Sequence, residues 1–349
     1  MSAAKMTSMQ RVLTTMGHEE PDRVPLLLPV TMHQAGELGC TLKQYFASVD
    51  ALEEGQLMVH RRLKTDGLIG FLYAAAEVEA FGGKTIFAED GPPNSSAPPL
   101  SSPEAVKMLE APDVHDCPSL VRTLALIRRL KKFGGDNVPV LAAAVAPFSL
   151  PVMQLGFDRY LDLLYGQPDL FWHLMKVNGD FCVQWANAQL EAGATAVTYF
   201  DPVSSPTIIP RELYLKTGLK VAQETLSRVN GPMVTHFASG RCLPIVDDVA
   251  TTPTAGISAT ALEPLAELKA KCRGRLTILG NLNAVEMCRW TVEETVQKVK
   301  AAVAAAGPGG GFVLTDNHGE IPLQVPLKVL DTVSLAVQRW GQYPLDWVQ

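Results

Sequence analysis

Residues Thr291–Thr315 read TVEETVQKVKAAVAAAGPGGGFVLT and predict one helix followed by one buried strand. The first threonine stands three residues before Glu294, the spacing of a capping box, so a helix is predicted over Thr291–Ala306. The glycine-rich segment Gly307–Gly311 ends this helix. The apolar run Gly311–Thr315 is typical of a strand with both faces buried.

Short apolar runs alternate with helical stretches along the whole chain. Long helices are predicted at Leu170–Glu191 and Arg211–Val229. Eight strands that alternate with helices predict an α/β protein, a single TIM-like (β/α)8 barrel. The alternative is a doubly wound open sheet, which the lack of a GxGxxG motif after any strand weakens. The other seven predicted strands are Val24–Val30, Asp66–Leu72, Val138–Val145, Ala196–Phe200, Pro232–Thr235, Ala255–Ala259 and Leu276–Leu279.

The predicted barrel is one domain over residues 1–349 with two additions. Residues 1–22 are expected to form an N-terminal helical extension. Residues 82–112 form a polar loop insert rich in Pro and Ser, which we expect to cross one mouth of the barrel.

The composition narrows the classes of partner and compartment. Lys and Arg number 30 against 36 Asp and Glu, and this acidic balance argues against nucleic acid or an anionic membrane as the main partner. The six cysteines form no CxxC pair, which fits a reducing compartment. No apolar run reaches the ~20 residues of a membrane span, and no secretory signal is visible. We therefore expect a cytoplasmic protein.

Polar side chains cluster where the predicted strands end, which in a barrel is where the chemistry takes place. The histidines His33, His236 and His318 are expected to meet at one mouth, although each has the ordinary alternative of a hydrogen-bonded loop residue. No GxSxG, HExxH or P-loop motif occurs. The other polar residues after strands are Gln34, Tyr73, Glu77, Glu79, Asp201, Asn281, Asp316 and Asn317.

Six blocks of the sequence, in order and over nearly the whole chain, resemble the uroporphyrinogen decarboxylase superfamily. This resemblance implies a single distorted (β/α)8 barrel, in agreement with the strand count. The blocks are VPLLLPVTMHQAG (24–36), DGLIGFLYAAAEVEAFG (66–82), APFSLPVMQLG (146–156), FDPVSSPTIIPREL (200–213), LGNLN (279–283) and NHGEIPLQVP (317–326).

Departures from the decarboxylase pattern indicate another substrate. The arginines that bind the carboxylates of uroporphyrinogen fall on His33 and Glu37 here. A glutamate in place of an arginine repels the substrate's carboxylates instead of attracting them. The essential Asp after the second strand falls on Tyr73, and only the histidine of the Asn-His-Gly motif is kept, as His318. Carried over by position, the resemblance implies substrate-binding roles for Met32, Gln34, Glu79, Met153, Asn281 and Asn317.

The chain is more similar to the corrinoid-linked methyltransferase branch, in DRVP (22–25), AEVEAFG (76–82) and THFASGRCLPIV (235–246). In that branch a His and two Cys hold a zinc ion that activates a thiol as methyl acceptor. Here His236 matches the histidine, whereas the cysteines fall on Ala238 or Ser239 and on about Asp316. The zinc motif is therefore incomplete.

Two interpretations of the site remain open. One is a harder metal site for zinc or another divalent ion, with His236 and Asp316 as ligands and Glu79 or His318 as further candidates. The other needs no metal and relies on acid–base side chains to protonate the leaving group. The candidate catalytic residues are then His318, Asp201, Tyr73 and His33.

The resemblance implies a methyltransferase that moves a methyl group between a small methylated substrate, a methoxyl compound or methylamine, and cobalamin. The cobalamin would arrive on a separate corrinoid protein, because no Asp-x-His-x-x-Gly cobalamin motif occurs here. A homodimer is common in this superfamily. Two alternatives stay open: a decarboxylase-type lyase on a small acid that uses His318 and Asp201, and a degenerate barrel that binds a tetrapyrrole or corrinoid protein without turnover.

Overall fold

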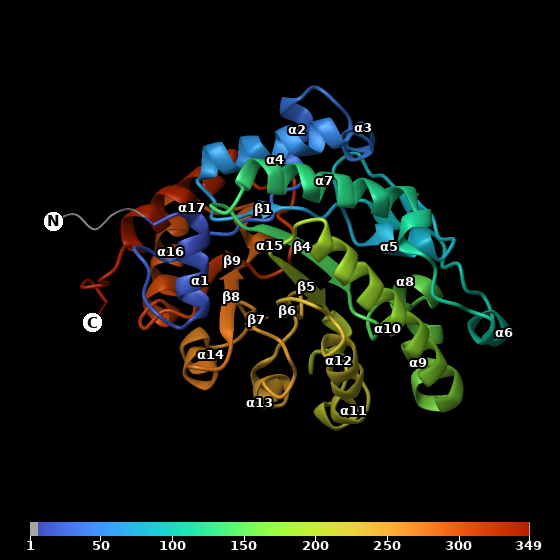
Figure 1. Ribbon diagram of the computed structural model, residues 1–349. Coiled ribbons are helices and arrows are strands. Elements are labelled where there is room, and N and C mark those ends of the chain that lie inside the picture. The colour runs from blue at the N-terminus through green and yellow to red at the C-terminus, as the bar shows by residue number, and fades with distance from the viewer. Residues whose placement is uncertain (1–5, 349) are drawn as a thin grey trace.

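The computed structural model describes residues 6–348, and its centre is a seven-stranded parallel sheet that curls into a barrel (Figure 1). The strand order β1-β4-β5-β6-β7-β8-β9 follows the chain, as repeated βα units require. The predicted α/β barrel is therefore confirmed. The strands are β1 Leu68–Ile69, β4 Val140–Val145, β5 Ala196–Phe200, β6 Met233–His236, β7 Gly256–Ser258, β8 Thr277–Leu282 and β9 Phe312–Asp316.

The first predicted strand, Val24–Val30, is not a regular strand, yet it occupies the eighth place in the wall. The Leu26 carbonyl accepts from the Asp66 N–H at 2.7 Å, and the Leu27 N–H donates to the Leu314 carbonyl at 2.9 Å. The segment thus joins β9 to the start of β1. Pro25 and Pro29 have no N–H to donate, so a continuous ladder cannot form here.

Helices cover the outside of the sheet, and the predicted helix that ends at Ala306 is confirmed together with its capping box. The predicted helix over 211–229 is instead two helices, because Thr217 leaves helical geometry and its hydroxyl donates to the Leu213 carbonyl at 2.6 Å. The main helices are α2 His33–Glu37, α3 Leu42–Ala47, α4 Val49–Leu63, α5 Ala75–Ala80, α7 Pro118–Gly134, α8 Pro151–Leu155, α9 Phe157–Gly166, α10 Pro168–Glu191, α11 Arg211–Lys216, α12 Gly218–Leu226, α13 Val246–Val249, α14 Leu265–Cys272, α15 Ala284–Met287, α16 Val292–Ala306 and α17 Leu327–Trp340. Within the described range, no helix is both long and apolar enough to cross a membrane.

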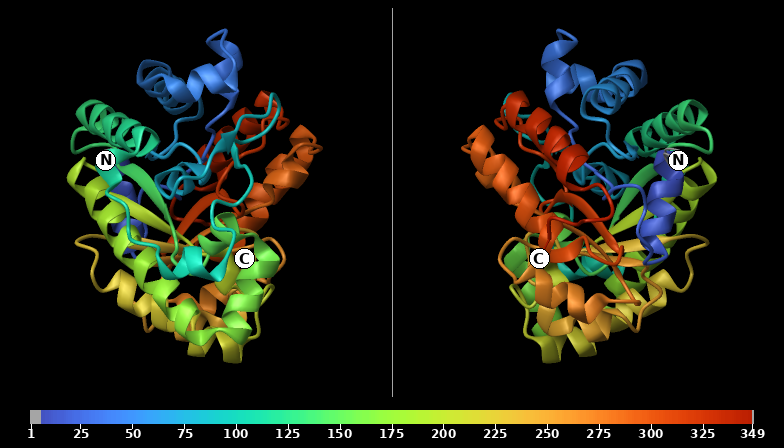
Figure 2. Two further views of the ribbon diagram at one scale, coloured as in Figure 1. Left: turned by 90° about the vertical axis from the view of Figure 1, so that its right-hand side faces the viewer. Right: turned by 90° about the vertical axis from the view of Figure 1, so that its left-hand side faces the viewer.

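The insert after α5 contains a two-stranded hairpin, β2 Thr85–Ile86 with β3 Asn94–Ser95, and the short helix α6 Pro103–Lys107. Figure 2 (left) views the molecule from the side on which this insert runs across the front. The Gln324 amide donates to the Asp90 carbonyl at 2.6 Å, so the insert is tied to the loop that follows β9.

The N-terminal helix α1 (Ser8–Met16) is fastened to the barrel by a buried ionic network. Arg11 donates to Asp22 and to Asp66, each at 2.6 Å, and Arg23 donates to Asp66 at 2.6 Å. Asp66 also accepts the Leu26 N–H at 2.9 Å. One carboxylate therefore holds together the N-terminal helix and residues 24–30, which we call the closing segment.

Candidate active site

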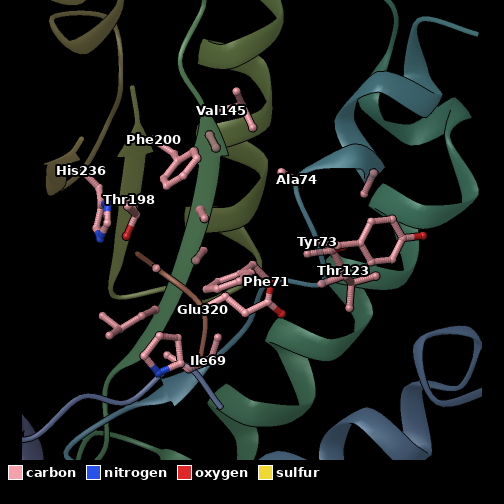
Figure 3. A pocket seen from close by; sticks show the side chains of 18 of the residues that line it. Ile69, Phe71, Tyr73, Ala74, Thr123, Val145, Thr198, Phe200, His236 and Glu320 are labelled. Atoms are coloured by element: carbon pink, nitrogen blue, oxygen red, sulfur yellow. The ribbon is translucent and has the colours of Figure 1, made fainter. Parts of the chain in front are cut away.

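A cavity of about 210 Å³ opens inside the barrel among the carboxyl ends of the strands (Figure 3). Its walls are mostly apolar. Among the residues that the structure describes, no lysine or arginine lines it. The ionisable side chains in its wall are Tyr73, Glu77, His236, Asp316, His318 and Glu320.

His236 ends β6 and presents a neutral ring to the cavity. Burial, and then the nearby His318, lower its pKa to about 4. Its Nδ1 accepts the Ala238 N–H at 2.9 Å, and Ala238 has a left-handed backbone with φ of 51°. An accepting Nδ1 places the ring proton on Nε2, so His236 offers an N–H donor.

The end of β9 supplies three further polar groups. One oxygen of Asp316 accepts the N–H groups of His318 and Gly319 at 2.7 and 2.9 Å, and burial raises the Asp316 pKa to about 6. Within residues 6–348, the other Asp316 oxygen and Nδ1 of His318 are buried without a hydrogen-bond partner. Burial raises the pKa of Glu320, which accepts from the Thr31 hydroxyl, to about 7.

Glu77 of α5 forms the opposite end of the cavity. Its two carboxylate oxygens share the Val145 N–H at 2.9 and 3.1 Å. Burial raises its pKa to about 8, because few polar groups replace the lost water. Glu77 is therefore mostly a neutral acid at pH 7.

The structure brings together some of the candidate catalytic and metal residues but not all of them. His236, Asp316 and His318 line one cavity. Tyr73 also lines it, but its hydroxyl donates to Glu79 at 3.4 Å, and Figure 3 shows that hydroxyl directed away from His236.

Asp201 and His33 do not line the cavity. The Asp201 carboxylate accepts the Ser149 hydroxyl at 2.6 Å, and burial raises its pKa to about 6. The chain turns away after Val30 into α2, and there the Nε2 of His33 lies 3.0 Å from the Val325 carbonyl. The expected meeting of three histidines is therefore limited to two.

The six residues with predicted substrate-binding roles all lie outside the cavity wall. Asn317 donates to Thr260 at 3.4 Å, and Glu79 accepts from Thr85 of the insert. The other four are Met32 and Met153 in apolar packing, Gln34 in a small hollow beside α4, and Asn281 in β8.

Glu320 and Trp185 line the cavity but are absent from the sequence-based candidates. Glu320 stands two residues after His318, so the strand-end rule would have found it. Trp185 lies in the C-terminal third of the long helix α10, where the sequence offers no signal of a site.

The donor set does not fit the zinc ion that activates a thiol. In residues 6–348, no group of three His, Cys, Asp or Glu side chains is arranged to hold a metal. A metal-bound histidine normally donates its second ring N–H, whereas Nδ1 of His236 is an acceptor. The metal role of His236 and Asp316 stays a prediction that this hydrogen bond does not favour.

Comparison with known proteins covers almost the full length of the chain. The profile of the uroporphyrinogen decarboxylase (URO-D) family matches residues 7–340. A uroporphyrinogen decarboxylase of Mannheimia succiniciproducens is 25% identical over 352 residues, which span 93% of this chain and 96% of that protein. The methylcobamide:CoM methyltransferase MtaA of Methanosarcina barkeri (strain Fusaro) is 26% identical over 212 residues, 60% of each protein.

Among solved structures, a methyltransferase from Methanosarcina mazei has the same fold, with a TM-score of 0.83 at 20% identity over 96% of this chain and 99% of that one. The resemblance read from the six sequence blocks is confirmed, and the relatives with methyltransferase names agree with the methyltransferase branch. Since the profile spans nearly every described residue, the chain belongs to the uroporphyrinogen decarboxylase family.

Proposed function

We propose that this protein is a methyltransferase that moves a methyl group between a small methylated substrate and the cobalamin of a separate corrinoid protein. The similarity to methylcobamide:CoM methyltransferase MtaA supports the methyl-transfer chemistry. The substrate is a methoxyl compound or a methylamine. The protein acts in the cytoplasm, and a homodimer is its expected form.

The charge of the cavity is the observation that carries this proposal. Uroporphyrinogen has eight carboxylates and needs cationic partners, whereas the cavity wall contains Glu77, Asp316 and Glu320 and, over the described residues, no lysine or arginine. At pH 7 Asp316 is mostly ionised, because its pKa is about 6, and it would repel the carboxylates of uroporphyrinogen, whereas the mostly neutral Glu77 offers them no positive charge. At about 210 Å³ the cavity is also smaller than the ~300 Å³ at which sites for drug-sized ligands begin. A small, uncharged or cationic substrate fits this wall, and a tetrapyrrole with eight acids does not.

The side chains around His236 suit the activation of a leaving group. When the methyl carbon leaves an oxygen or nitrogen, the electron pair of the broken bond stays on that atom and has to be stabilised. The Nε2–H of His236 can donate to it, and His318 or Glu320 can supply a proton. Cobalamin on the partner receives the methyl group and provides the nucleophile.

The proposal is tested by measuring methyl transfer to cobalamin through the change in its absorbance spectrum. The purified protein is mixed with cob(I)alamin and either a methoxyl compound or a methylamine, and conversion to methylcobalamin is expected with one of the two classes. His236→Phe keeps an aromatic ring beside Phe200 but has no N–H donor, and it serves as the comparison. If neither class gives methylcobalamin while a small carboxylic acid loses CO2, the lyase interpretation replaces this one.

A further inference from the structure

The barrel wall is open between β1 and β4. In the described residues these strands pair only at Leu68↔Val140 and Ile69↔Leu141. Beyond that point side chains from helices bind the edge of β4: Gln189 donates to the Ala143 carbonyl at 3.0 Å, and Glu77 accepts the Val145 N–H. Two helical side chains therefore stand where a neighbouring strand would continue.

The cavity passes through this opening and reaches the helical layer. Residues Leu141–Val145 line it on both faces of β4, and the three small alanines in this stretch leave room on each side. Figure 3 shows His236, Thr198 and Phe200 on one side of β4, and Tyr73 and Thr123 on the other.

We call the space on the outer side of β4 the side chamber. It is bounded by Glu77 of α5, Leu120 and Thr123 of α7, Ala144 of β4 and Trp185 of α10.

The side chamber contains two polar groups in an apolar wall. Glu77 and Trp185 are 5% and 2% exposed. Within the described part of the chain, the Trp185 indole N–H makes no well-formed hydrogen bond, although it lies near enough to Glu77 to lower the pKa of that carboxyl. A buried N–H in this state gains a full hydrogen bond when a ligand atom accepts from it.

We propose that the side chamber binds the part of the substrate that does not react, through an uncharged oxygen atom on an apolar ring or short chain that contacts Trp185 and Glu77. The methyl group then lies on the inner side of β4, near His236. This inference rests on the proposed function only for the identity of the substrate. Binding of a ligand in the side chamber can be measured whether or not the protein transfers a methyl group.

The chemistry of the two groups selects an uncharged acceptor. The indole N–H can only donate, and Glu77 in its neutral form donates its O–H. An ammonium ion has no lone pair to accept either bond. A ligand carboxylate would find no cationic side chain to pair with, because the described wall holds neither lysine nor arginine. Leu120, Thr123 and Ala144 complete a narrow, largely apolar slot.

The protonation of Glu77 gives the binding a pH dependence with a definite sign. Its pKa is raised to about 8 by burial, and the Val145 N–H and then Trp185 lower it in part. Below pH 8 the neutral acid donates to the ligand; as the pH rises through 8 the carboxylate forms, and binding weakens. The other ionisable groups near it are Cys182 on α10, Tyr73 before α5, and Glu320, Asp316, His318 and His236 across the cavity.

Calorimetric titration of the full chain with 4-methoxyphenol and with anisole, which lacks the second oxygen, tests the proposal without any corrinoid. We expect 4-methoxyphenol to bind more tightly than anisole and to lose affinity between pH 7 and pH 9. Trp185→Phe keeps the ring but not the N–H, and should weaken 4-methoxyphenol about three- to tenfold, the ordinary contribution of one hydrogen bond. Glu77→Gln keeps an acceptor for Val145 and an N–H donor for the ligand, so it should bind without pH dependence.

Trp172→Phe, at an exposed position of the same helix, is the matched control and should change nothing. Equal binding of the two ligands, or tighter binding of trimethylammonium than of 4-methoxyphenol, would overturn the proposal. These results need only the wild-type protein, so they stand even if a variant fails to fold. Normal binding without methyl transfer counts against the proposed function alone, whereas active transfer with equal binding of both ligands counts against the side chamber alone.

Discussion

Replacement of Asp66 by asparagine should destabilise the protein strongly, because Asp66 is the centre of the buried ionic network. Its side chain is fully buried, and it accepts from Arg11, Arg23 and the Leu26 N–H at 2.6 to 2.9 Å. Asparagine keeps an acceptor for Leu26 but removes the charge that both guanidinium groups face. Removing one partner of a buried ion pair costs about 3–5 kcal/mol, a large part of a typical total stability of ~5–15 kcal/mol.

Urea unfolding followed by circular dichroism measures this loss as a lower midpoint at unchanged slope. Asp50→Asn is the matched control, because the Asp50 side chain is 85% exposed and pairs with Arg129 on the surface. It should cost less than about 1 kcal/mol. In an Arg23→Gln background the Asp66 substitution should cost less than it does alone, since the two residues share the interaction. An Asp66→Asn loss no larger than that of Asp50→Asn would refute the reasoning.

Four further outcomes follow from the site and the backbone. His236→Phe should lower the rate of methyl transfer about 10²–10³-fold with little change in unfolding midpoint, because it removes one pre-oriented donor; an unchanged rate would remove His236 from the mechanism. Gly310→Ala should destabilise by more than about 1 kcal/mol, since φ is +67° and an added Cβ would lie 2.2 Å from the Glu19 carbonyl oxygen; thermal unfolding beside Gly166→Ala, where space is open, measures it. Thiols such as coenzyme M should not accept methyl from methylcobalamin, and uroporphyrinogen should not lose CO2; rapid thiol methylation, or coproporphyrinogen by chromatography, would contradict these expectations.

Most of the barrel could be predicted from sequence because buried parallel strands leave continuous apolar runs. The runs that end at Val145, Phe200 and Thr315 all coincide with strands. Val24–Val30 has the same apolar character, yet its two prolines prevent a ladder, and only hydrogen bonds from neighbouring strands define its place. The break at Thr217 has no proline, and the Gly218 that follows it is a weaker signal that a helix can also tolerate.

The site was less predictable because the end of a strand fixes where a residue lies but not where its side chain points. His236 and Asp201 follow adjacent strands, and the Asp201 N–H donates to the His236 carbonyl at 2.8 Å. The histidine lines the cavity, whereas the Asp201 carboxylate accepts from Ser149. Trp185 reaches the cavity only because β1 and β4 separate, a consequence of tertiary structure that no local pattern encodes.

The closing segment has a consequence for the order in which the barrel can form during synthesis. Residues 23–27 bond to β9 and to the region after α17: Val24 donates to the Gly341 carbonyl at 2.8 Å, and Leu27 donates to Leu314. Leu314 and Gly341 are synthesised long after residues 23–27, so this segment is seated only once β9 and α17 have been made. Such pairing between distant parts of the sequence slows folding and leaves apolar surface uncovered for longer. Residues 26–28 therefore take their place in the barrel wall late, after β9 has been synthesised.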